Sequence, residues 1–169
     1  YGKYLSTTAV YCNDRSTSDN LNFGARTRLI TNKTPSYDCA TTEDKFTVDS
    51  STGNGKLTYP IALMTADEVS FAGGVYGTNA PAWYYYNSAN GSSTGSTWWW
   101  LLSPNFWDGS RAGVFFVGGS SFPGSFSGDY VGNTGNVRPA ISLKSCIKYS
   151  TGNGSASDPY TIKETSSGC

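Results

Sequence analysis

The chain has 169 residues, and its 12 basic residues balance its 12 acidic ones. This length fits one domain that can bury its own core, and the neutral balance gives no electrostatic basis for binding nucleic acid or an anionic membrane. No apolar run reaches 18 residues, which excludes a membrane-spanning helix. Charged residues make up only 14% of the chain, whereas aromatic residues reach 15% and Ser and Thr are abundant. Such a composition is typical of a β-rich extracellular domain with many loops.

The first third of the chain alternates short apolar runs with turn residues. It shows no sustained helical period, so we expect short strands and loops there. The chain starts at Tyr1 without the charged and apolar segments of a signal peptide, and we therefore expect a mature or excised domain.

The clearest helix is predicted over residues 65 to 72. Thr65 and Glu68 have the spacing of a capping box, in which the Thr hydroxyl accepts from the amide of residue 68 and the Glu carboxylate reaches back. Gly73 and Gly74 follow, and glycine is the residue that most readily ends a helix. Asp67 and Glu68 are therefore interpreted as helix-start residues and not as a catalytic pair.

Strands are predicted on both sides of this helix. Leu57 to Met64 favours a buried strand, with Pro60 at an edge or bulge. Further strands are expected at residues 114–117, 137–143 and near 160–162, and a polar loop at 87–97. The fold class is therefore α+β, with short strands, few short helices and long ordered loops.

Four cysteines are present, without a C-x-x-C pair and without any His, which argues against a zinc site. Two disulfides are the better interpretation, and free buried thiols are the alternative. Of the three possible pairings we favour Cys12–Cys39 and Cys146–Cys169, because each closes a short loop at one end of the chain. Each bridge would add roughly 3 kcal/mol of stability. No metal or cofactor is expected.

No enzyme motif is found. The chain lacks a His for a triad, a G-x-S-x-G elbow and a phosphate loop. Asp108 and Asp129 would supply the two carboxylates that glycoside hydrolysis needs, but their spacing carries no signature. Asp in a Gly/Ser-rich segment is more often a turn former, so we expect a binding protein and not an enzyme.

Aromatic residues are concentrated in one part of the chain. Fourteen of the 25 lie between Trp83 and Tyr130, including all five Trp. Exposed Trp and Tyr mark binding surfaces, although strand alternation should turn about half of them into the core. Residues 105 to 136 also lack Lys, Glu, Gln, Met, Ile and Leu, a bias similar to that of an antibody paratope.

Several motifs together resemble a known family. The motifs are AVYCNDR (9–15), YPIALMTADEVSFAGG (59–74), WWWLLSP (98–104), the VFFV strand (114–117), VRPAISLKS (137–145) and a G-x-G…DPYTI ending (152–162). In combination they resemble the C-type-lectin-fold variable proteins of diversity-generating retroelements, of the type found in gut Firmicutes and their phages. These proteins are distantly related in fold to formylglycine-generating enzymes.

The resemblance implies a single C-type-lectin-like domain over residues 1–169, secreted or displayed on a cell or virion. In this family a reverse transcriptase mutates template adenines and so diversifies a variable region, here about 105–136. Asn codons changed in this way cannot become Lys, Glu, Gln, Met or Trp, so Trp107 would be a fixed position. The implied ligand-binding residues are Asn105, Phe106, Trp107, Asp108, Ser110, Arg111, Gly113, Phe122, Ser125, Phe126, Asp129, Tyr130, Asn133 and Asn136.

The chain departs from two relatives of this fold. It lacks the Glu-Pro-Asn, Gln-Pro-Asp and Trp-Asn-Asp triplets of calcium-dependent sugar-binding lectins. It also has no reactive cysteine pair near the implied site, so the activity of formylglycine-generating enzymes is not implied.

The expected function is recognition of a protein or glycan on another cell, with Arg111 as a polar anchor and Phe106, Phe122, Phe126 and Tyr130 as apolar anchors. Two alternatives stay open. One is a non-diversified carbohydrate-binding module with an aromatic platform, and the other is a structural subunit of a surface assembly.

Overall fold

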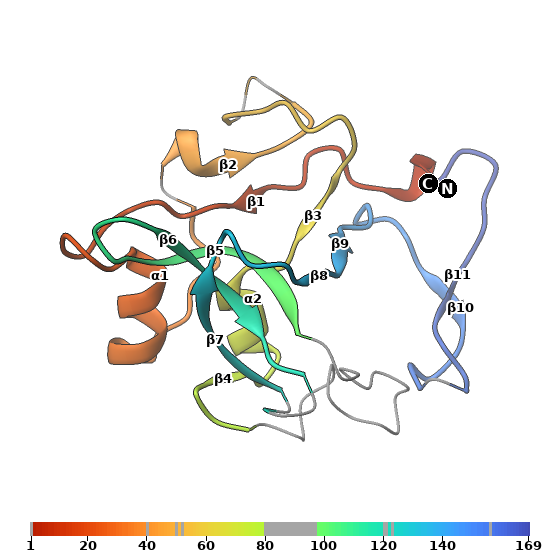
Figure 1. Ribbon diagram of the computed structural model, residues 1–169. Helices are drawn as coiled ribbons and strands as arrows, with labels where there is room; N and C mark the ends of the chain where they lie inside the picture. Colours follow the sequence, from red (N-terminus) through yellow and green to blue (C-terminus); the bar gives the residue numbers. More distant parts are fainter. Residues whose placement is uncertain are drawn as a thin grey trace.

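A five-stranded mixed sheet forms the centre of the fold (Figure 1). The computed structural model describes residues 2–39, 41–49, 51, 53–79, 98–119, 122, 124–155 and 157–169. The strands lie in the order β4 (Val75–Tyr76), β7 (Ser125–Tyr130), β6 (Ala112–Val117), β5 (Trp99–Trp107) and β8 (Asn136–Val137). The three central strands are antiparallel, and each edge strand runs parallel to its neighbour.

Three two-stranded pairs and a few short helices surround this sheet. The pairs are β1 (Tyr11–Cys12) with β2 (Lys45–Phe46), β3 (Ile61–Leu63) with β9 (Pro139–Ile141), and β10 (Tyr149–Thr151) with β11 (Thr161–Ile162). The helical segments are α1 (Gly24–Arg26) continued by a wider turn at Thr27–Asn32, α2 (Ala66–Phe71), and 3-10 turns at Gly2–Tyr4 and Thr42–Asp44. The described part of the chain is thus α+β, as predicted.

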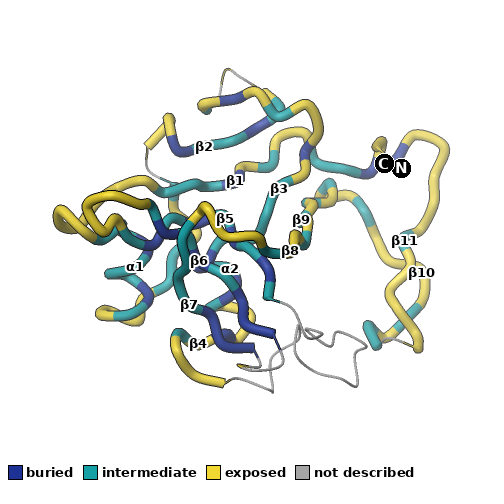
Figure 2. Tube along the Cα trace, viewed as in Figure 1, coloured by how far each residue is buried: buried dark blue, intermediate teal, exposed yellow. Residues whose placement is uncertain are grey.

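Strand β5 alternates strictly between buried and half-exposed residues over most of its length. We call the side of the sheet that carries its buried residues the inner face, and the opposite side the outer face. The inner face packs against α1 and α2 to form the core, which contains Ala25, Leu29, Ala66, Val69, Trp99, Leu101, Phe115, Val117 and Phe126. Figure 2 shows burial concentrated where the sheet meets these helices, whereas the β10–β11 hairpin is mostly exposed.

Three separate segments cover the second edge of β5. Near its start it pairs with β8. At its middle the Leu102 amide donates to the Met64 carbonyl at 2.8 Å. At its end the Trp107 amide donates to the Leu21 carbonyl at 2.7 Å, and the Asn105 carbonyl accepts from the Phe23 amide at 3.1 Å. The strand is therefore hydrogen-bonded on both sides, so its position is well determined.

The predicted helix at 65–72 is confirmed as α2, and both bonds of the capping box form. Thr65 Oγ1 accepts from the Glu68 amide at 3.1 Å, and the Glu68 carboxylate accepts from the Thr65 amide at 2.7 Å. A further amide at this helix start, that of Ala66, donates to the Ser103 hydroxyl on β5 at 2.9 Å. The helix start is thus fixed to the central strand.

Asp67 at the start of α2 joins the two helices through Arg28. The Arg28 guanidinium donates to both Asp67 oxygens at 2.7 Å and to Asp14 at 2.9 Å. These hydrogen bonds, first that from Arg28 to Asp67, raise the pKa of Arg28 above its usual value. Asp67 is buried and also accepts from the Ser36 amide, so its role in this structure is to hold the turn at Thr27–Asn32, which continues α1, against α2.

Other predictions of secondary structure were wrong in extent. The helical segment at residues 24–32 was not expected, because only Ala25 and Leu29 of it are buried and two residues make no visible period. The strand expected over 57–64 is reduced to β3, and its Ile61 is exposed. The strand expected over 137–143 is divided into β8 and β9.

Both predicted cysteine pairs are confirmed. Cys12 lies opposite Cys39, and Cys146 opposite Cys169, with Cα–Cα distances of 5.7 and 5.8 Å. The first bridge ties β1 to the segment before β2, and the second ties the end of the chain to the turn before β10. None of the described helices is both long and apolar enough to cross a bilayer.

Replacing Asp67 tests the helix connection. Asp67→Asn removes one of the two carboxylates that face a largely buried Arg28, so we expect a loss of about 3 kcal/mol in the free energy of unfolding. Urea denaturation followed by circular dichroism measures it. The matched change Asp38→Asn, at an exposed position, should alter the unfolding free energy by less than about 0.5 kcal/mol. Equal effects of the two changes would contradict the role given to Asp67.

Candidate ligand-binding surface

The turn between β5 and β6 is organised by one carboxylate. Asp108 Oδ1 accepts from the Ser110 amide and hydroxyl, both at 2.9 Å, and from the Arg111 amide at 2.7 Å. Gly109 takes a left-handed backbone conformation with φ of 94°, which glycine adopts without steric cost. The prediction that Asp108 forms a turn is thus confirmed.

The same hydrogen bonds act on the titration of Asp108. The amides of Ser110 and then Arg111 hold the pKa of Asp108 well below its ordinary value, and the hydroxyls of Ser110 and Tyr130 add to this. A lowered pKa means that the charged form is stabilised by folding. The turn therefore keeps this contribution in full above the usual pKa of an Asp, and loses it progressively as the pH falls from there through the lowered value.

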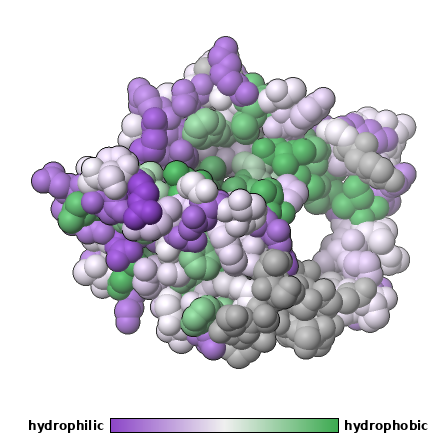
Figure 3. Space-filling model, viewed as in Figure 1, coloured by the Kyte–Doolittle hydropathy of each residue, from purple (hydrophilic) through white to green (hydrophobic). Residues whose placement is uncertain are grey.

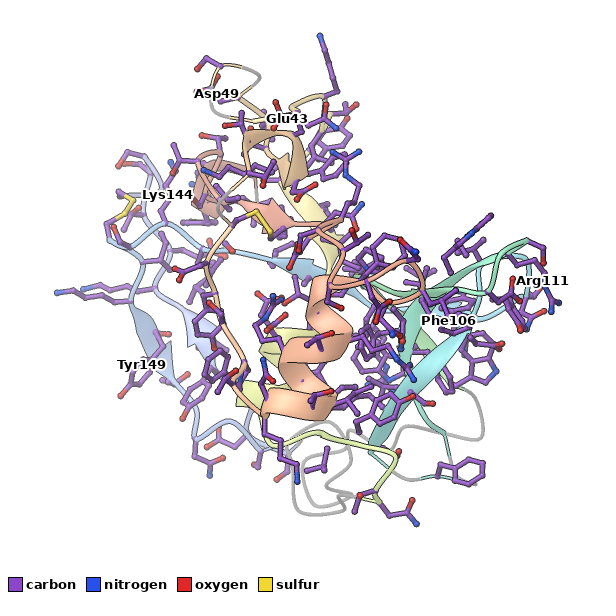
Figure 4. All side chains as sticks on the ribbon, turned by 90° about the vertical axis from the view of Figure 1, so that its left-hand side faces the viewer. Glu43, Asp49, Phe106, Arg111, Lys144 and Tyr149 are labelled. Carbon is purple, nitrogen blue, oxygen red and sulfur yellow. A yellow bond between two sulfur atoms is a disulfide. The ribbon has the colours of Figure 1, made fainter. Side chains whose placement is uncertain are left out.

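The Arg111 guanidinium lies over the ring of Tyr130. Its guanidinium carbon is 3.6 Å from the centre of the Tyr130 ring, and one nitrogen is 3.4 Å from Asp108 Oδ2. Phe106 meets the Tyr130 ring edge to face, with centroids 5.4 Å apart. The Arg111 side chain is still 61% exposed, and Figure 4 shows it at the outermost point of this end of the sheet, beyond Phe106. A cation over an aromatic face is attracted by the ring quadrupole, so the guanidinium is held in place and accessible.

Gly113 lets these two rings meet. Phe106, Gly113 and Tyr130 are direct neighbours across β5, β6 and β7, and side chains that face each other across strands share one side of the sheet. A methyl group at Gly113 would overlap the Phe106 ring. The glycine therefore makes the gap in which the Phe106 ring lies next to Tyr130.

Three other predicted residues lie at the same end of the sheet but on its outer face. Trp107 pairs with Ala112, and Asp129 pairs with Val114, which places both on the side opposite to Phe106 and Tyr130. Asn133, in the turn after β7, donates to Asp129 at 2.8 Å. We call the combined surface the sheet tip, formed by Phe106, Trp107, Asp108, Ser110, Arg111, Asp129, Tyr130 and Asn133.

Four of the implied ligand-binding residues are buried, so the prediction that they contact a ligand is wrong. Asn105 is fully buried, and its Oδ1 accepts from Arg26 at 2.6 Å. Phe126 is 1% exposed and packs against Phe115 and Tyr76 in the core. Ser125 and Gly113 are also buried. Asn105, Gly113 and Phe126 belong to the inner face, whereas Ser125, next to Phe126 on β7, is buried on the opposite side of the strand.

Two more implied residues are exposed but lie elsewhere. Phe122 is in the connection between β6 and β7, at the other end of these strands from the sheet tip. Asn136 is on β8, opposite Trp99 at the start of β5. A six-residue strand is about 20 Å long, so neither residue joins the sheet tip.

Sequence reasoning missed Leu21, whose carbonyl accepts from the Trp107 amide and whose side chain is exposed beside this end of β5. Its pairing spans more than 80 positions of the chain, and no local pattern indicates such a contact. The aromatic run Trp83–Tyr86 and the predicted loop at 87–97 lie outside the described residues.

Within the described ranges, His, Cys, Asp and Glu form no cluster of three or more that could hold a metal ion. No protein-family model matches the sequence, and neither the curated proteins nor the solved structures contain a significant match to it.

A substitution at Gly113 tests how the sheet tip is built. In Gly113→Ala the new methyl group must displace Phe106, so we expect a loss of about 1–3 kcal/mol in unfolding free energy. Shifted ring resonances of Phe106 and Tyr130 in the NMR spectrum should accompany it. Gly132→Ala is the matched control, because a Cβ there has open space and no strained backbone, and it should leave both measurements unchanged. Unshifted ring resonances in Gly113→Ala would show that the ring contact does not depend on the glycine.

Proposed function

We propose that this chain is a recognition module that binds its ligand through the sheet tip and does not catalyse a reaction. The observation that carries the proposal is the exposed Arg111 guanidinium, held on the Tyr130 ring above a self-contained turn. A side chain that is already ordered loses little conformational entropy on binding. This supports a surface made for contact with a partner.

The composition of the sheet tip supports the same function. Arg, Trp and Tyr are the residues most enriched at the energetic centres of protein interfaces. Here Arg111 and the 41% exposed Trp107 lie beside small polar residues, Ser110 and Asn133. Rigid aromatic anchors next to adaptable polar groups are also the pattern of antibody paratopes.

We further propose a C-type-lectin-like fold and a diversified surface, as the motif resemblance implies. The candidate variable positions are now narrower, because Asn105, Gly113, Ser125 and Phe126 are buried and would be fixed. Secretion or display on a cell or virion is part of this proposal. Two cysteine pairs at disulfide distance support an oxidising compartment.

Binding measurements on tip variants test the recognition function. The protein is screened against arrays of bacterial surface proteins and of glycans, and the affinity of each hit is then measured by biolayer interferometry. Arg111→Ala and Tyr130→Ala should each weaken binding at least tenfold, as loss of a central anchor does. Lys163→Ala removes an exposed cation directly after β11, a strand that is not part of the central sheet, and should change the affinity less than twofold. A ligand that binds all three variants equally would place recognition outside the sheet tip.

The flanking DNA tests diversification separately. We expect a near-identical copy of the codons for residues 98–145 that differs only at adenines, next to a reverse-transcriptase gene. The differing codons should fall at exposed tip positions such as Ser110 and Arg111 and should spare Asn105 and Phe126. If no such copy exists, the recognition surface remains but its diversification does not.

A further inference from the structure

The outer face of the sheet contains an apolar hollow that the proposed function does not use. It has a volume of about 380 Å³ and lies between β2, β3, β5, β8 and β9. We call it the outer groove. Its walls include Phe46, Leu57, Ile61, Leu63, Leu102 and Val137. Figure 3 shows apolar side chains gathered in this region, with hydrophilic residues around it.

Backbone pairing fixes the walls of the outer groove. β3 pairs with β9 over three residues, and the Met64 carbonyl that follows β3 accepts from the Leu102 amide. On the other wall the Leu57 amide donates to the Thr47 carbonyl. The Tyr11 hydroxyl on β1 donates to the Pro60 carbonyl at 2.8 Å, directly before β3. A hollow whose walls are joined in this way is present before any ligand arrives, and its volume is that of a small ligand pocket.

The lining of the groove selects its occupant. Among the described residues that line it, none is charged, and Asn13 offers the one polar side chain. A sugar or a charged group placed here would give up its hydrogen bonds to water and find almost no replacement, which is costly. An aliphatic or aromatic side chain has no hydrogen bonds to water to lose, and its burial in the groove is favourable because it removes apolar surface from water. Val137 is 63% exposed and Ile61 is exposed too, so much of this surface now faces solvent.

The outer groove and the sheet tip are continuous along one strand. Leu102, Pro104 and Trp107 all project from β5 to the outer face, and Val114 lies beside Pro104. Five residues of strand span roughly 17 Å. A standard interface covers about 800 Å² on each partner, roughly 30 Å across. One partner can therefore cover the outer groove and the outer-face residues of the sheet tip, which are Trp107, Asp129 and Asn133.

We propose that the ligand of this module is a protein that inserts an apolar side chain into the outer groove while its polar surface contacts the sheet tip. The inference rests on the proposed recognition function and narrows it from a protein or glycan ligand to a protein ligand. An apolar centre beside a polar rim is the usual anatomy of a protein interface. The groove supplies the centre, and the outer-face residues Asp129 and Asn133 supply part of the rim.

Side-chain analogues test the groove directly on the intact chain. N-acetyl-leucinamide and N-acetyl-phenylalaninamide are titrated into ¹⁵N-labelled protein, with glucose and N-acetylglucosamine as sugar probes. We expect saturable shifts of the amides of Ile61, Leu63, Leu102 and Val137 with Kd values on the order of a few millimolar for the two apolar probes. The sugars should leave these amides unshifted. Saturable shifts by a sugar, or none by either apolar probe, would overturn the proposal.

A matched pair of variants tests whether the groove contributes to ligand binding. Val137→Asp puts a charge at the groove on β8, and Val75→Asp makes the same change on β4, the opposite edge of the sheet, where Val75 is 50% exposed. Val137→Asp should weaken the binding of the apolar probes and of the screened protein ligand at least tenfold. Val75→Asp should change either affinity less than twofold. Folding of both variants is checked by their amide spectra.

The two proposals fail in different ways. A protein ligand that requires Arg111 but tolerates Val137→Asp would overturn the groove proposal and leave the recognition function standing. Probes that bind the groove in a protein for which the screen finds no ligand would remove the recognition function and, with it, the assignment of the groove to a protein partner. A glycan ligand that requires Arg111 would likewise overturn the narrowing to proteins.

Discussion

The alternation of β5 is the constraint on which the rest of the structure depends. Its inward residues, Trp99, Leu101, Ser103 and Asn105, each meet a different part of the inner layer, and neighbours hydrogen-bond the strand along both edges. The apolar pair supplies burial, at about 2–3 kcal/mol for each large side chain. The polar pair supplies orientation, because Ser103 accepts from the first amide of α2 and Asn105 accepts from Arg26 on α1. One strand thus positions both helices on its inner face, and the sheet tip lies at its far end.

Locally encoded features were predictable from sequence, and features that depend on distant partners were not. Both residues of the capping box of α2 lie within four consecutive positions, so the start of the helix could be predicted correctly. The Cys pairs followed from short loop closure. The burial of Phe126 did not follow, because the glycine-rich sequence around it resembles a loop. In the structure Gly128, on the same strand as Phe126, faces Asn105, and a methyl group at this glycine would overlap that side chain. Gly113 on β6 likewise makes room for Phe106. A glycine that makes room for a neighbour and a glycine in a flexible loop look alike in one sequence.

The bulge near Asn105 explains why the predicted site residues divide into separate groups. Pro104 pairs with Val114 and Phe106 with Gly113, so β5 has one extra residue at this point. Asn105 and Phe106 consequently both project to the inner face, and Trp107 projects to the outer one. Asn105 is buried and accepts from Arg26, whereas the Phe106 ring meets Tyr130, over which Arg111 lies. Without the bulge, simple alternation would have turned Phe106 to the outer face and separated it from Tyr130.

The separation of exposed tip residues from buried residues determines which positions can be substituted without a large loss of folding stability. Substitutions at Ser110, Arg111 or Asn133 affect side chains in exposed turns, and changes at such positions usually shift stability by less than about 0.5 kcal/mol. Substitution of Asn105 would instead remove the acceptor of a charged hydrogen bond from Arg26 in a buried place, which costs about 1–3 kcal/mol. The Asp108 turn is the intermediate case, because its carboxylate orders the backbone that presents Arg111. The recognition proposed for the sheet tip and the stability of the core therefore depend on different residues of the same strands, so exposed tip residues can be substituted while β5 keeps its partners.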